Sequence, residues 1–124
     1  MKMVQIVAVR KMIDELRQTK FCSKTAYKLM KLSKSVDVEK AFYEEKIREI
    51  IDEYGQKDEN GNLIKSDGGI KIDETRIDDC NKAVSELNDV EVQKPDITFT
   101  VEELSPALLS LDDMMLISEF IVES

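Results

Sequence analysis

One long stretch without glycine or proline decides the fold: KTAYKLMKLSKSVDVEKAFYEEKIREIIDEY, residues 24–54. Apolar or aromatic side chains recur in it at steps of seven residues, at Leu29, Val36, Tyr43 and Ile50. A seven-residue step keeps side chains on one face of an α-helix, which here would be roughly 45 Å long at 1.5 Å per residue. The stretch therefore predicts one long amphipathic helix.

The two ends of this helix are marked by residues typical of helix termini. Ser23 is the predicted N-cap, because a serine hydroxyl can accept a hydrogen bond from a free backbone N–H in the first turn. Gly55 is the predicted residue at which the helix ends. The weakest stretch is SKSVD, residues 33–37, where a bend or a break into two helices is the alternative to a continuous helix.

A first, shorter helix is predicted upstream of the long one. Its apolar residues are separated by three, four and three positions, at Ile6, Val9, Ile13 and Leu16. This spacing suits one helical face. The β-branched residues at its start leave a short strand over residues 3–9 as the alternative.

The chain downstream alternates between turn signals and short apolar patterns. Asn60-Gly61 and Asp67-Gly68-Gly69 are turn signals, and the apolar residues around them predict a hairpin between residues 63–64 and 70–72. Asp73 is expected to cap a further helix. Its buried stripe is predicted to contain Ile77, Cys80, Val84 and Leu87.

Two expectations concern the C-terminal third. Alternating apolar residues at Ile97, Phe99 and Val101 predict a strand. Ser105-Pro106 predicts the start of a last helix that reaches residue 121, with a division near residues 110–112 as the alternative to a continuous helix. The fold class is therefore mainly α (α+β): a single domain over residues 1–124 with one long amphipathic helix, a small β-hairpin and one or two short strands.

The composition excludes several kinds of chemistry. The chain has no histidine and two cysteines, so histidine-dependent nucleophiles, histidine-ligated zinc and four-cysteine zinc sites cannot form. No glycine-rich phosphate loop is present. Asp58, Asn60 and Asn62 resemble the opening of a calcium-binding EF-hand loop, but Leu63 and Gly69 stand where glycine and glutamate are needed. We expect a non-enzymatic protein with no cofactor, no metal and no membrane-spanning segment.

Charge is distributed very unevenly along the chain. Residues 1–34 carry nine basic and two acidic side chains, whereas residues 35–124 carry nine basic and 24 acidic ones. On a helix, Lys24, Lys28 and Lys31 share one side, which predicts either a contact with phosphates or an acidic protein, or a solvated face that neutralises the rest of the molecule. The second interpretation is favoured, since few aromatic side chains accompany the lysines. Nucleic acid is therefore not the expected partner.

The apolar C-terminal stretch is a second candidate contact surface. It contains Met114, Met115 and Phe120, which serve either as core residues or as part of a groove for a partner. The heptad-spaced face of the long helix is a third, and it would support a homo-oligomer.

Four motifs occur in order along the chain: KTAYKLMKL (24–32), EYGQKDENGNL (53–63), NKAVSEL (81–87) and LSPALLSL (104–111). With these motifs the chain resembles a group of small bacteriophage and prophage proteins of Gram-positive (Firmicutes) bacteria. The resemblance implies a phage context, in the cytoplasm of the host cell or in the virion. It carries no catalytic residue with it.

Two functions follow as hypotheses. The favoured one is a phage protein that acts through protein–protein contact, as a virion component or an assembly accessory. The alternative is an acidic, anti-CRISPR-like inhibitor of a host defence or nucleic-acid-binding protein, in which arrays of carboxylates stand in for phosphates.

Overall fold

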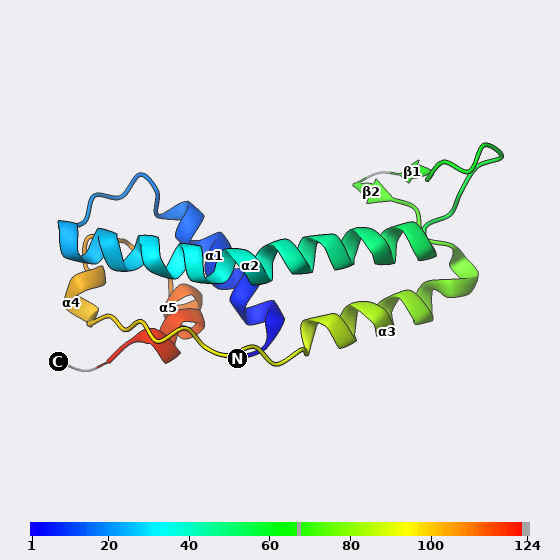
Figure 1. The fold of residues 1–124 in the computed structure, drawn as a ribbon. Coiled ribbons are helices and arrows are strands. Elements are labelled where there is room, and N and C mark those ends of the chain that lie inside the picture. Colours follow the sequence, from blue (N-terminus) through cyan, green and yellow to red (C-terminus); the bar gives the residue numbers. More distant parts are fainter. Residues whose placement is uncertain (67, 123–124) are drawn as a thin grey trace.

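The long helix α2, Ser23–Tyr54, is the axis of the fold in the computed structural model, which describes residues 1–66 and 68–122 (Figure 1). The predicted helix is confirmed as one continuous element. Residues 33–37 stay helical because Val36 is fully buried and Asp37 accepts a hydrogen bond from the preceding helix. Cys22, and not Ser23, is the N-cap, and its thiol lies 3.3 Å from the Thr25 hydroxyl.

Helix α1, Met3–Glu15, crosses the first half of α2. The strand alternative for residues 3–9 is wrong, since burial decides against the β propensity of these residues. Ile6 and Val9 are fully buried against α2, and helical spacing is what points both of them to the same side. Tertiary packing therefore outweighs the local preference of β-branched residues.

Three short helices complete this end of the molecule: α4, Val101–Leu104; α5, Leu111–Ile117; and the 3-10 helix η2, Ser118–Phe120. Together with α1 and the first half of α2 they enclose the core. The core consists of Ile6, Val9, Met12, Ile13, Leu29, Leu32, Val36, Phe99, Leu104, Ile117 and Phe120. The N-terminal and C-terminal segments of the chain thus share one hydrophobic core.

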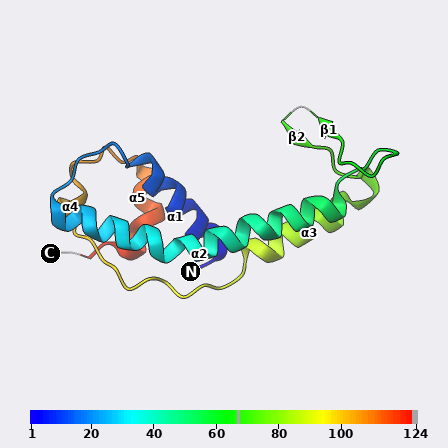
Figure 2. The same ribbon diagram turned by 45° about the horizontal axis from the view of Figure 1, so that its top comes forward.

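The second half of α2 packs against α3, Ile77–Asn88, and the two helices form an arm that leads away from the core (Figures 1 and 2). Cys80 and Leu87 are buried as predicted, whereas Ile77 at the helix start is exposed. Tyr43 of α2 donates a 2.8 Å hydrogen bond to the Asn88 side chain. Of the heptad-spaced residues of α2, Leu29 and Val36 are therefore buried within the chain, and Tyr43 and Ile50 are half-buried.

The predicted hairpin is present at the end of the arm, but its two strands lie closer to the turn than the predicted residues 63–64 and 70–72. It pairs β1, Lys65–Ser66, with β2, Gly69–Ile70, in antiparallel register. Ile64 donates to the Gln56 carbonyl at 2.9 Å and accepts from Lys71 at 2.8 Å. The hairpin thus rests on the residues that follow α2, as an isolated hairpin must to be stable.

Gly55 ends α2, although not through the left-handed conformation that often follows a helix. Its backbone is extended, with φ −69° and ψ 142°. A Cβ atom would lie 2.6 Å from the Ile51 carbonyl oxygen and 2.6 Å from a methyl carbon of Leu63. Glycine is required here because the hairpin approaches the end of the helix so closely. Asp73 then caps η1, Glu74–Arg76, by accepting from the Thr75 amide at 3.0 Å.

The predicted strand over residues 97–101 is wrong. Phe99 alone is paired, through hydrogen bonds with the Phe120 carbonyl at 2.7 Å and the Val122 amide at 2.8 Å. Immediately afterwards Thr100 and Glu103 cap each other's backbone amides and start α4. Of the one or two short strands expected, the described residues contain isolated bridges at Lys2–Glu91 and Phe99–Ile121.

The last helix also begins later than predicted. Ser105 is the C-cap of α4, and α5 begins after Ser110, whose hydroxyl accepts from the Asp113 amide at 3.1 Å. Residues 105–110 are not helical, so the prediction of a helix from Ser105 is wrong, and the division expected near residues 110–112 is instead the start of α5. The fold class, mainly α with a small β element, is confirmed.

Candidate interaction surfaces

The three predicted lysines lie together on the first half of α2. Lys24, Lys28 and Lys31 line one groove of about 420 Å³, which Tyr27 and residues 96–98 complete. The Lys31 ammonium lies 5.6 Å from the centre of the Tyr27 ring, and Lys24 is exposed. The sequence pattern therefore located a real surface feature.

Lys28 is occupied within the chain. Its ammonium donates to the Glu103 carboxylate at 2.9 Å and to the Thr98 carbonyl at 2.9 Å, and it lies over the Phe99 ring. The hydrogen bond from Lys28 is the main cause of a lowered pKa at Glu103. Lys28 therefore anchors the C-terminal segment onto α2, which favours the intramolecular interpretation of the lysine face for this residue.

The fold redistributes the charge that the sequence separates. Residues 94–122 carry six acids and one base, and they fold back onto the basic residues 1–34. That end of the molecule has a net charge of only about +2. Residues 37–91, which contain the arm, carry 17 acids and eight bases, or about −9. The molecule is thus nearly neutral at its core end and strongly acidic along its arm.

The three C-terminal candidates have different environments. Phe120 is a core residue with 1% exposure, and the Lys94 ammonium lies 5.5 Å from the centre of its ring. Met114 is half-buried. Met115 is exposed, at 66%. Of the three predicted residues, Met115 is therefore the one fully open to a partner.

Two exposed leucines accompany Met115, and the sequence reasoning missed them. Leu108 is 101% exposed and Leu111 is 77% exposed. Leu111 and Met115 are four residues apart on α5 and share a face, whereas Leu108 lies in the loop that leads into α5. We call these three residues the α5 apolar face. A seven-residue helix with five apolar side chains cannot bury them all, and that was the available signal.

A preformed apolar pocket lies between α1 and α2, with a volume of about 230 Å³. We call it the α1–α2 pocket. Its apolar lining consists of Ile13, Leu16, Phe21, Ala26, Leu29 and Met30. Arg17, whose side chain is 68% exposed, stands at its edge. The pocket is thus an apolar recess in the basic part of the chain.

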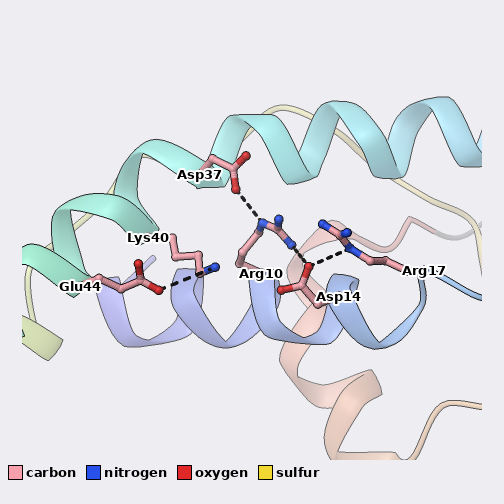
Figure 3. Close-up of polar contacts among 6 residues, drawn as sticks. All are labelled: Arg10, Asp14, Arg17, Asp37, Lys40 and Glu44. Carbon is pink, nitrogen blue, oxygen red and sulfur yellow. Dashed lines mark hydrogen bonds and ion pairs between the residues drawn. The ribbon is translucent and has the colours of Figure 1, made fainter.

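The most buried charge in the described residues is Arg10, which joins α1 to α2 (Figure 3). Its Nε donates to Asp37 at 2.7 Å, and its Nη1 donates to Asp14, which also accepts from Arg17 at 3.2 Å. The Arg10 hydrogen bond is the main cause of a lowered pKa at Asp14. Every member of this cluster has a partner within it, so we interpret it as a structural clasp between two helices.

The remaining reactive or metal-binding candidates are accounted for by local structure. Asp58 accepts from the amides of Asn60 and Asn62 at 2.9 and 3.0 Å, and so stabilises a turn. Cys22 is exposed and Cys80 is buried, and both are free thiols. Within residues 1–66 and 68–122, no three acidic or thiol side chains gather as a metal site would require.

The helices of the described part of the chain include none with the length and apolarity to cross a bilayer. Comparisons with protein-family models, with curated protein sequences and with solved structures find no match to this chain. Functional inference therefore rests on the surfaces described above.

Proposed function

We propose that this chain is a non-enzymatic bacteriophage protein that acts through protein–protein contact, as a virion component or an assembly accessory. The observation that carries the proposal is the α5 apolar face. Solvent contact of Leu108, Leu111 and Met115 is unfavourable, since burying each such side chain contributes about 1.5–3 kcal/mol. Exposed apolar clusters with a polar surround are typical of interaction sites.

The surroundings of this face favour a specific contact over non-specific hydrophobic association. Asp112 follows Leu111 in the first turn of α5 and gives the face an acidic edge, whereas Asp113 accepts a hydrogen bond from the Ser110 amide. The helix itself is fixed, because Ile117 on its other side belongs to the core. A rigid apolar face with an acidic edge suits a partner with an apolar recess and a basic rim.

The proposal is tested by genetics in a bacterium that carries the gene within a prophage. Leu111→Asp places a carboxylate in the apolar face, yet it adds an acid to a helix N-terminus, where the helix dipole tolerates it. Val38→Asp, at a residue of α2 that is 71% exposed, is the matched control. We expect Leu111→Asp to lower the yield of infectious particles after induction and Val38→Asp to leave it unchanged. Equal yields from both variants would contradict the proposal.

A second candidate function is an acidic inhibitor of a host defence or nucleic-acid-binding protein, acting in the host cytoplasm. The observation that favours it is the arm, whose helices α2 and α3 carry most of the excess of carboxylates away from the core (Figure 2). Mimicry predicts binding to a basic host protein that weakens steeply with salt. An affinity that is unchanged between low and moderate salt would exclude it.

A further inference from the structure

The outer side of the first half of α2 is basic and free of acids. Residues 16–36 contain six lysines or arginines and no aspartate or glutamate. At about 3.6 residues per turn, Lys24, Lys31 and Lys34 lie on the outer half of the helix, away from the buried Leu29 and Val36. All three lysines are exposed, and in the part of the chain that the structure describes none of them forms an ion pair. This side of α2 therefore keeps its positive charge.

Two exposed side chains without charge lie among these lysines. Tyr27 is 58% exposed and Met30 is 43% exposed. Tyr27 lies three residues from Lys24 and four from Lys31, and Met30 lies four residues from Lys34. Side chains at these spacings are neighbours on a helix surface. We call these five residues the α2 basic face.

A recess flanks the α2 basic face on each side. One is the groove of about 420 Å³ that Lys24, Tyr27 and Lys31 line, in which Ile97 and the apolar stems of the lysines add to the apolar surface. The other is the α1–α2 pocket of about 230 Å³, which Met30 lines. An apolar cavity of roughly 150 Å³ holds a molecule as large as benzene, so each recess has room for a large apolar side chain.

Two acids lie near this face, and neither cancels its charge. Glu103 is bound by Lys28 at 2.9 Å, so it neutralises a lysine outside the face. Asp96 lines the larger recess. The three lysines of the face against this one aspartate leave a local charge of about +2. Charge complementarity therefore selects a negatively charged occupant.

The composition of the face favours an acidic protein over a nucleic acid. Proteins usually hold single-stranded nucleic acid by stacking its bases on aromatic rings. Tyr27 is the one aromatic residue of the face, and the Lys31 ammonium lies 5.6 Å from the centre of its ring. A phosphate backbone also has no side chains to fill recesses lined by Leu16, Phe21 or Ile97. A protein segment supplies both carboxylates and apolar side chains.

We propose that the α2 basic face binds an acidic segment of a partner protein. Carboxylates of the segment pair with Lys24, Lys31 and Lys34, and its large apolar side chains enter the two recesses. Covering Tyr27 and Met30 excludes water from these ion pairs, which strengthens them. The surface shares no residue with the α5 apolar face, so this inference goes beyond the proposed function and stands independently of it.

The probe is a labelled peptide of glutamate and leucine in a two-to-one ratio, and fluorescence anisotropy measures its binding at about 0.15 M salt, where distant charges are screened. A second peptide has serine in place of every leucine and the same charge. We expect the leucine peptide to bind at least about tenfold more tightly, since its leucines become buried. Equal affinities of the two peptides would overturn the proposal. Tighter binding of a single-stranded oligonucleotide of the same charge would overturn it as well.

Charge reversal locates the binding site. The double variant Lys31→Glu/Lys34→Glu should bind the leucine peptide at least about tenfold more weakly than the unmodified protein. Lys71→Glu/Lys82→Glu is the matched control, because it changes the net charge equally at two exposed lysines outside the face. The control should retain the affinity, and an equal loss in both variants would overturn the proposal by showing that only net charge matters. Circular dichroism confirms that both variants are folded.

Sedimentation velocity of the protein alone tests a second copy of the chain as the occupant. We expect the unmodified protein and Lys31→Glu/Lys34→Glu to sediment alike. Self-association that is lost in this variant would overturn the proposal, because the acidic arm of a second copy would then occupy the face.

Discussion

Replacing Phe120 by alanine tests directly whether the C-terminal segment is part of the core or a partner surface. The Phe120 ring is fully enclosed, and its backbone carbonyl pairs with Phe99 in the bridge that joins the C-terminal segment to the core. Removing a buried phenylalanine side chain typically costs about 3–5 kcal/mol, from lost transfer energy and the cavity left behind. A domain of this size has a total stability of about 5–15 kcal/mol, so the variant should be markedly less stable yet still foldable.

Met115→Ala is the matched control, since it removes an apolar side chain of similar length from the same segment. Because Met115 is 66% exposed, its replacement should change the free energy of unfolding by less than about 0.5 kcal/mol. Urea unfolding followed by circular dichroism at 222 nm measures both values. The melting temperature of Phe120→Ala should fall by roughly 10 °C, at about 3 °C per kcal/mol. A cost below about 1 kcal/mol for Phe120→Ala, or comparable costs for both variants, would refute the assignment of Phe120 to the core.

Three further predictions concern other parts of the molecule. Gly55→Ala should destabilise the protein by more than about 1 kcal/mol in urea unfolding, because the new methyl group would lie 2.6 Å from a carbonyl oxygen of α2 and 2.6 Å from Leu63. An unchanged urea midpoint would contradict the prediction and show that these neighbours move aside freely. Cys22 is exposed and its pKa is lowered by the hydrogen bond with the Thr25 hydroxyl, so it should react rapidly with a thiol reagent, whereas Cys80 should react only as fast as the arm opens. Mass spectrometry of the labelled peptides measures the two rates separately. Equal rates would contradict the burial of Cys80. The pKa of Glu103 is lower in the folded protein than in the unfolded chain, so the bond with Lys28 stabilises the fold fully at pH values above the unfolded pKa. This stabilisation disappears as the pH falls through the folded pKa of Glu103. The stability of Glu103→Gln should therefore fall less steeply between pH 6 and pH 3, and parallel curves would argue against the bond.

The three longest helices could be predicted from the sequence because their signals are local. Each has an apolar stripe at helical spacing, and a stripe of that kind is buried in the same way whatever covers it. Cys80 illustrates the point: its place in the stripe of α3 predicted its burial, although nothing in the sequence identified α2 as the covering helix. Leu29 and Val36 show what such a local signal cannot predict, namely the covering partner, since their heptad spacing also fits a coiled coil between chains.

The strand over residues 97–101 could not be predicted correctly because a strand needs a neighbour. Alternation describes which side chains point inward, and Phe99 does point into the core. Up to residue 122, however, the segment that runs beside it supplies a single bridge, at Ile121. The competing local signal was present in the sequence: Thr100 and Glu103 have the spacing of a capping box, which starts a helix where the strand was expected to continue.

The charge of the surfaces was the feature least accessible from the sequence, and it changes the functional argument. Counting charges along the chain separates a basic segment from an acidic one, but Lys28 and Glu103 are 75 residues apart in sequence and 2.9 Å apart in space. This return of the acidic C-terminal segment neutralises much of the basic one, so a long-range attraction between opposite ends of two molecules is weaker than the sequence implies. Recognition by the core end must then depend on contacts within a few ångströms. There, the exposed leucines of α5 and the apolar recess beside Met30 are the surfaces whose solvent contact is most unfavourable.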